Sequence, residues 1–290
     1  MTTSERIDAH HHFWDPDRHH YPWMAGAPMD PVRRRFGPQD LRPVLDAAGI
    51  DGAVLVQTLS DSQETDEFLR LAHDNTFIRG VVGWVELVAD DVGAQLDRIL
   101  SEPTGRWLVG IRHQVHDEAD AAWLDRADVR RGIAAVGARG LAYDVLVRSR
   151  ELPAATNAIE GLPSMRFVLD HIAKPRIASG ADDLWESRMA RMARLPNVTV
   201  KLSGMVTEAD WSSWTPADLR PFVSKVLDWF GPDRLMFGSD WPVCLLAGSY
   251  PSVLQALAES VGRLSPSEEE SLYGGTARQA YRLEGRGDSG

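Results

Sequence analysis

The sequence predicts one (β/α)8 barrel, the α/β architecture known as a TIM barrel, in a single domain. Eight short apolar segments alternate with eight longer amphipathic segments along the 290 residues. Many of the short segments are continuous apolar runs, which is typical of parallel strands buried on both faces. Eight β→α units in a chain of this length are what one barrel requires. We expect the barrel to span residues 1–283 and a polar tail to occupy residues 284–290.

Each element is predicted from a local signal. Apolar, β-branched runs predict strands at residues 6–11, 52–57, 79–84, 107–112, 141–147, 167–170, 198–202 and 235–238. Amphipathic periodicity, closed by glycines such as Gly49 and Gly140, predicts helices at residues 38–48, 63–75, 92–101, 124–138, 149–159, 184–194, 216–229 and 252–261. A final helix is expected around residues 266–273. The long segment 15–37, rich in Pro and Arg, is predicted to lie over the C-terminal face as a lid or binding loop.

Composition excludes several classes of function. The chain has 31 basic and 42 acidic side chains and a formal net charge of −11. This acid excess argues against a nucleic-acid partner, because affinity for nucleic acid comes from basic patches. No apolar run approaches the roughly 18 residues of a membrane span, and no apolar signal segment precedes the first histidines. We therefore expect no membrane partner. The one cysteine, Cys244, cannot form an internal disulfide, so we expect a cytoplasmic protein.

The first predicted strand ends in a run of three histidines. Active sites of barrels lie at the C-terminal ends of the strands, so polar residues that follow strands are the candidates. Alternate residues of a strand face the same way. His10 and His12 are therefore predicted to point together into the barrel mouth, with His11 facing outward. Two imidazoles at this spacing form a metal-binding or oxyanion-binding pair.

Two later strand ends extend this cluster. His171 follows the sixth strand, and Asp240 follows the eighth. His171 adds a third imidazole, and the carboxylate of Asp240 can accept a proton from water or ligate a metal. We predict His10, His12, His171 and Asp240 as both the catalytic residues and the metal ligands.

Further strand-end residues are candidates for binding a substrate. Arg112 could hold a carboxylate or polarise a carbonyl, and His113 could donate a hydrogen bond. Lys201 lies in an apolar strand and must either face the mouth or pair with an acid below it. Glu86 is a candidate metal ligand or substrate contact, with a rim ion pair as the alternative, and Trp23 is a candidate substrate contact from the first loop.

Five motifs, in order along the chain, resemble the amidohydrolase superfamily. They lie at residues 7–14, 109–113, 169–175, 201–209 and 236–243, and the match extends from residue 5 to about 283. The branch they resemble contains sugar-lactone hydrolases such as L-fuconolactonases, together with dicarboxylate and muconolactone-type lactonases. The resemblance implies a metallo-dependent-hydrolase-like barrel. It assigns the family's histidine pair to His10 and His12, its later histidine to His171 and its last-strand aspartate to Asp240.

The reaction that the resemblance implies is attack of water on a lactone carbonyl, with Asp240 as general base. The expected partner is a small-molecule lactone, such as the aldonolactones L-fuconolactone or L-rhamnonolactone. Some relatives carry a divalent metal, and others work without one. The sequence offers no evident carboxylated-lysine bridge for a two-metal site, so we expect one metal, zinc or manganese, or none.

Two other functions remain alternatives at this point. One is a metal-dependent decarboxylase of an aromatic or muconate-type acid from the same superfamily, which would use the same histidines and aspartate. The other is a non-catalytic barrel that binds a sugar acid. The oligomeric state is also open, because residues such as Trp211 and Trp214 could supply either a substrate wall or the interface of a homo-oligomer.

Overall fold

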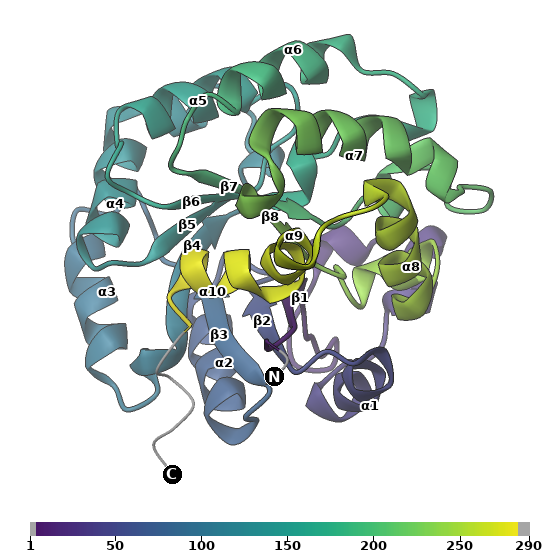
Figure 1. The fold of residues 1–290 in the computed structure, drawn as a ribbon. Helices are drawn as coiled ribbons and strands as arrows, with labels where there is room; N and C mark the ends of the chain where they lie inside the picture. Colours follow the sequence, from purple (N-terminus) through teal and green to yellow (C-terminus); the bar gives the residue numbers. More distant parts are fainter. Residues whose placement is uncertain (1–3, 284–290) are drawn as a thin grey trace.

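The computed structural model describes residues 4–283, and the predicted barrel is confirmed there. Parallel strands pair in chain order from β1 to β8 (Figure 1). Their bounds are β1 Ile7–His11, β2 Gly52–Val56, β3 Ile78–Gly83, β4 Leu108–His113, β5 Ala142–Val145, β6 Phe167–Leu169, β7 Val198–Leu202 and β8 Leu235–Phe237. The barrel closes just beyond β8, where His12 N donates to Trp241 O at 2.7 Å and Asp240 N donates to His10 O at 2.9 Å.

Helices follow the strands and form the outer layer of the molecule (Figure 1). Their bounds are α1 Pro38–Ala48, α2 Ser62–Asp74, α3 Val92–Ser101, α4 Ala127–Ala138, α5 Leu152–Glu160, α6 Asp183–Met192, α7 Pro216–Phe230, α8 Tyr250–Val261, α9 Pro266–Glu270 and α10 Thr276–Tyr281. None of the helices within residues 4–283 is long and apolar enough to cross a bilayer. The predicted polar tail, residues 284–290, lies outside the described residues.

Two apolar clusters hold the barrel together. The larger lies between strands and helices, and the smaller fills the inside of the barrel with residues such as Ile7, Val54 and Val168. Helix α10 contributes Ala277 and Tyr281 to the inner cluster, so it covers one end of the barrel (Figure 1). The site must therefore open at the other end, where the strands terminate.

The end of the chain differs from the prediction. One helix was expected around residues 266–273, but α9 stops at Glu270 and a turn of π-helix, Ser271–Gly275, leads into α10. Gly274 explains the break, since a Cβ there would lie 2.2 Å from the carbonyl oxygen of Glu5. The chain passes Glu5, just before β1, too closely at this point for any residue but glycine.

A shift of register in β1 decides which side chains reach the site. Asp8 pairs with Ala53 but His11 pairs with Leu55, so β1 uses one more residue than β2 over this stretch. Ile7 and Ala9 face the inner apolar cluster. Because the irregularity lies between Asp8 and His11, His10 also turns inward, together with His12. The ring of His11 packs against Phe13, with ring centroids 4.9 Å apart. Such irregularities re-aim side chains and are common beside active sites.

Candidate active site

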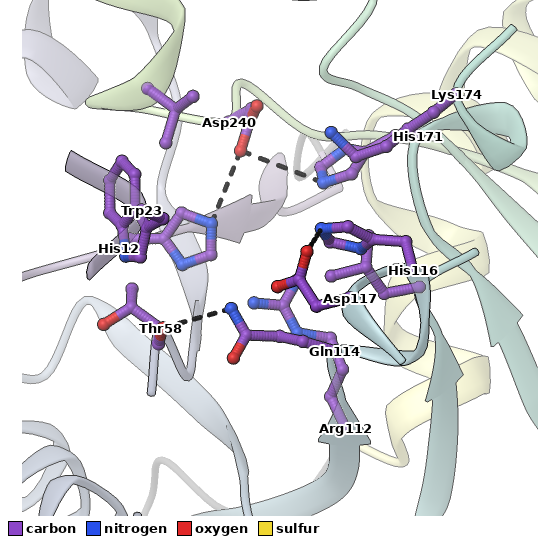
Figure 2. Close-up of a pocket in the computed structure, with 12 residues that line it drawn as sticks. His12, Trp23, Thr58, Arg112, Gln114, His116, Asp117, His171, Lys174 and Asp240 are labelled. Atoms are coloured by element: carbon purple, nitrogen blue, oxygen red, sulfur yellow. Dashed lines mark hydrogen bonds and ion pairs between the residues drawn. The ribbon is translucent and has the colours of Figure 1, made fainter. Parts of the chain in front are cut away.

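Three imidazoles surround the carboxylate of Asp240 at the open end of the barrel. Its Oδ1 lies 3.4 Å from Nε2 of His12, 3.7 Å from Nε2 of His10 and 4.0 Å from Nε2 of His171. All four side chains are buried. Figure 2 shows Asp240 between His12 and His171, with its carboxylate turned toward both rings. The structure thus brings together all four residues predicted as catalytic.

The electrostatics of this cluster keep Asp240 ionised. Burial alone would raise the pKa of Asp240, but the neighbouring His171 and His12 side chains bring it below its ordinary value. Burial lowers the pKa of His171 to about 4 and the pKa of His10 well below its ordinary value. An ionised carboxylate among neutral imidazoles can accept a proton from water, which is the requirement for a general base.

His171 reaches the site through an unusual backbone turn. Residues His171, Ile172, Ala173 and Lys174 all have positive φ, between 47° and 59°. Non-glycine residues rarely adopt this region, and such strain concentrates at functional sites. The Nδ1 of His171 lies 2.8 Å from Oγ of Ser203, which fixes the ring plane. The turn directs His171 toward Asp240 and also places Lys174 beside the pocket.

The two neighbouring residues Arg112 and His113 point in different directions. Arg112 lines the pocket, where its guanidinium donates to Asp170 Oδ2 at 3.0 Å and to the carbonyl of Gln57. His113 instead stacks on Trp123, with ring centroids 4.3 Å apart. Consecutive residues of a strand face opposite sides, so the two cannot both enter the barrel mouth. The structure does not place His113 among the residues that line the pocket.

Lys201 lies beneath the site. Of the two orientations that the sequence allowed, the structure has the buried one: Lys201 Nζ lies 2.6 Å from Asp144 Oδ2 and 2.9 Å from Asp170 Oδ1. It also lies 3.1 Å from Nδ1 of His10. Its side chain is fully buried and does not line the pocket. Lys201 therefore contacts a predicted catalytic histidine from behind.

The pocket above this cluster has a volume of about 160 Å³ and a mixed polar and apolar lining. Trp23 from the long first loop lines it, as the sequence suggested for a binding loop. Glu86 is exposed and belongs to neither group of neighbouring metal-ligand atoms in the described part of the chain. The remaining wall is formed by Thr58, Gln114, His116, Asp117, Leu146, Lys174 and Val243.

Sequence reasoning did not single out most of this wall. Thr58 follows β2, while Gln114 and His116 follow β4, so the strand-end rule applied to every polar residue would have found them. Lys174 gave no such signal, because its place depends on the left-handed turn after β6. Glu64 was also missed: it accepts hydrogen bonds from the backbone amide of Thr58 at 2.7 Å and from its hydroxyl, and so holds Thr58 in the wall.

The donor atoms suit a divalent metal. Within residues 4–283, His10, His12 and Asp240 form one group of neighbouring ligand atoms, and His10, Asp170 and His171 form another. Imidazole nitrogens and carboxylate oxygens are ordinary zinc ligands. The second group is the poorer candidate, because Asp170 already pairs with Arg112 and Lys201. The first group fits a divalent ion in residue type and spacing.

A (β/α)8 barrel with an aspartate and three histidines at its strand ends has the side chains needed to hold a divalent ion and to activate water for hydrolysis. Residues 7–283 match the profile of the amidohydrolase family. The chain belongs to this family, as the five sequence motifs predicted.

Three similar proteins are informative. The chain is 43% identical to an L-fucono-1,5-lactonase of Burkholderia multivorans and 40% identical to one of Burkholderia ambifaria, each over 96% of both chains. It also superposes with a TM-score of 0.90 on a crystal structure of an amidohydrolase from Burkholderia multivorans with bound zinc. That alignment has 41% identity and covers 97% of this chain and all of the other.

Proposed function

We propose that the protein hydrolyses the ring ester of an uncharged sugar lactone, an aldonolactone. The observation that carries this proposal is the position of Asp240, whose Oδ1 lies within 4.0 Å of an imidazole nitrogen of His10, His12 and His171. The high identity to two L-fucono-1,5-lactonases over nearly the whole chain supports the lactone as substrate.

Asp240 acts as general base in the proposed reaction. Its carboxylate removes a proton from water as the water oxygen bonds to the lactone carbonyl carbon. The carbonyl oxygen becomes an oxyanion, and the neighbouring imidazole N–H groups and the guanidinium of Arg112 stabilise its charge. When the tetrahedral intermediate collapses, the bond to the ring oxygen breaks. The protonated Asp240 returns its proton to that alkoxide, and the product is the open-chain hydroxy acid.

A divalent ion fits the same residues. His10, His12 and Asp240 would hold it, with His171 adjacent, and we propose zinc or manganese as the ion. When bound, it would act as a Lewis acid that polarises the carbonyl. The zinc-bound structure of a similar amidohydrolase supports a metal of this kind.

The charges in the wall favour an uncharged substrate. Of the cations that line the pocket, Arg112 is paired with Asp170 at 3.0 Å and Lys174 with Glu208 at 3.0 Å. A lactone that carries carboxylates would have to compete with these internal acids for a partner. The hydroxyl of Thr58, the amide of Gln114 and the imidazole of His116 line the pocket instead, and these groups can form hydrogen bonds with the hydroxyls of a sugar ring.

The apolar part of the wall suits a deoxysugar. Trp23, Leu146 and Val243 line the pocket together with the polar groups. L-Fuconolactone and L-rhamnonolactone each carry a methyl group at C6, which such a surface can cover. Burial of one methyl group contributes about 0.8 kcal/mol. We therefore propose these 6-deoxy aldonolactones as the preferred substrates.

The test is a pH-indicator hydrolysis screen on purified protein, before and after chelation, with metal content measured on the same sample. The panel compares aldonolactones with and without the C6 methyl group, and pyrone and muconolactones that carry carboxylates. Acid release from the deoxy aldonolactones is expected. No acid release from any lactone, together with release of CO2 from an aromatic acid, would instead establish the decarboxylase reaction. Ligand binding without turnover, unaffected by Asp240→Asn, would establish a non-catalytic barrel.

A further inference from the structure

The long first loop reaches the pocket through Trp23, which lies in a single turn of 3-10 helix, Pro22–Met24 (Figure 2). Two backbone hydrogen bonds form this turn, donated by Met24 N at 3.0 Å and by Ala25 N at 3.2 Å. A single turn fixes several backbone dihedrals in return for few hydrogen bonds, so it is not stable on its own. Contacts from outside the turn must therefore hold Trp23 in place.

Packing supports only part of this turn. The ring of Trp23 meets Trp14 edge-on, with centroids 5.1 Å apart, and meets Tyr21 edge-on at 6.4 Å. Pro22 and Met24, the residues on either side of Trp23, line a second hollow with a volume of about 720 Å³. A hollow offers no partner atoms to the residues that face it. Packing alone therefore does not keep the turn where it is.

Arg33, from the later part of the same loop, binds the end of the turn. Its guanidinium donates to the carbonyl oxygen of Met24 from Nη2 at 2.7 Å and from Nε at 3.2 Å, and Nη2 also donates to the carbonyl oxygen of Gly26 at 2.5 Å. The remaining nitrogen, Nη1, donates to Asp30 Oδ1 at 2.6 Å. Basic side chains can bind the last carbonyls of a helix in this way, and a planar guanidinium reaches several acceptors at once. Arg33 thus caps the C-terminal end of the turn that carries Trp23.

The two ends of the turn are held differently. On the N-terminal side, Glu67 of α2 pairs with Arg18 at 2.7 Å and with His19 at 3.0 Å. On the C-terminal side, residues 25–27 are small and exposed, and Gly26 has a φ of +91°, in the region that favours glycine. These residues contribute little packing, so the C-terminal end of the turn depends on the capping guanidinium.

We propose that Arg33 is a positioning residue that holds Trp23 in the wall of the active-site pocket. The first loop is then a preformed wall and not a lid that closes on the substrate. Without Arg33 the turn would leave this position for part of the time. A substrate binds only while the wall is in place, so its apparent affinity falls by the fraction of time that the turn is displaced. The effect on lactone binding rests on the proposed function, whereas the position of the ring does not.

The direct test is fluorine NMR of protein labelled with 5-fluorotryptophan, which needs no substrate. The spectrum of Trp23→Phe identifies the signal of Trp23 by its loss. In Arg33→Ala this signal should move toward its position in the unfolded protein, while the other tryptophan signals stay in place. Arg35→Ala is the matched control, because Arg35 belongs to the same basic run and lies 3.9 Å from its acidic partner Asp15. An unchanged Trp23 signal in Arg33→Ala, or an equal shift in Arg35→Ala, would overturn the proposal.

Steady-state kinetics on a 6-deoxy aldonolactone test the consequence for binding. Arg33→Ala should raise KM roughly fivefold, equivalent to about 1 kcal/mol, while kcat stays within about twofold. If Arg33 acts through Trp23, the same change in a Trp23→Ala background should leave KM unaltered. An unchanged KM in the single variant, or equal increases in both backgrounds, would contradict this action. If the wild type hydrolyses no lactone, the proposed function fails, and the fluorine spectrum still decides whether Arg33 positions Trp23.

Discussion

The carboxylate Oδ1 of Asp240 lies 3.4 Å from Nε2 of His12, although 228 positions separate the two residues along the chain. Backbone contacts fix this distance, because Asp240 N donates to His10 O and His12 N donates to Trp241 O. The same contacts close the barrel between β8 and β1. The relative position of base and imidazole is therefore set by the fold, as electrostatic preorganisation requires.

Gly204 should be essential for activity although it carries no functional group. Its φ is +61°, and a Cβ there would lie 2.5 Å from Nδ1 of His171. Gly204→Ala should displace His171 and lower kcat/KM about a hundredfold, the loss that a misplacement of about 1 Å can cause. Gly180→Ala is the matched control, because Gly180 has a similar φ of +73° with nothing within 4 Å. Equal activity of both variants would show that the position of His171 is unimportant.

Glu208 should set the preference for uncharged substrates. It pairs with Lys174 at 3.0 Å and with Arg148 at 3.2 Å, and so neutralises the cationic side of the wall. Glu208→Gln frees Lys174, so KM for carboxylated lactones should fall relative to KM for neutral lactones, roughly tenfold, or about 1.4 kcal/mol. Steady-state kinetics on both substrate types measure the ratio. Glu186→Gln removes a similar pair with Lys225 remote from the pocket and should leave the ratio unchanged.

Trp23 should contribute to substrate binding more than to chemistry. Its ring lines the pocket and packs edge-on against Trp14, with centroids 5.1 Å apart. Trp23→Ala should raise KM roughly tenfold while kcat stays within about twofold, because the contact is the same in the bound substrate and the transition state. Trp211→Ala, outside the pocket lining, is the control. A fall in kcat with constant KM would assign Trp23 to the transition state instead.

His116 should make the protein sensitive to acid. Burial lowers its pKa to about 3, whereas in the unfolded chain it keeps the ordinary value of 6.5. Between these pH values the unfolded chain binds a proton that the folded protein does not, so the free energy of unfolding decreases as pH falls. From pH 7 to pH 5 the wild type should lose about 1–2 kcal/mol more than His116→Gln. Denaturant unfolding at both pH values measures this, and parallel losses in the two proteins would contradict it.

The sequence alone predicted the barrel and most element boundaries to within a few residues, because strand and helix signals are local. Helix α4 shows the limit: it was expected from residue 124, but a turn of 3-10 helix, Trp123–Asp125, precedes it and α4 begins at Ala127. The break before α10 depends on contact between Gly274 and Glu5, which are far apart in sequence. Such long-range contacts leave no periodic signal.

The site was predictable where residues directly follow strands. His10, His12 and Asp240 were found this way, and the alternation of β4 would have separated Arg112 from His113. The buried cluster around Lys201 could not be found, because its acids lie on β5 and after β6 and only closure of the barrel brings them together. For Lys201 the sequence left two orientations open, toward the barrel mouth or toward an acid below it, and did not indicate which acid would pair with it.

The central claim is that Asp240 is the general base for hydrolysis of an aldonolactone. The most direct measurement is kcat/KM on a 6-deoxy aldonolactone for wild type and Asp240→Asn, with matched metal content and with Asp117→Asn, the other carboxylate of the pocket, as control. A general base contributes about 10²–10⁴-fold, so Asp240→Asn should lower kcat/KM at least about a hundredfold. A cooperative thermal unfolding transition should show that the variant is still folded. Asp117→Asn should retain most of its kcat. Near-wild-type hydrolysis by Asp240→Asn would contradict the account.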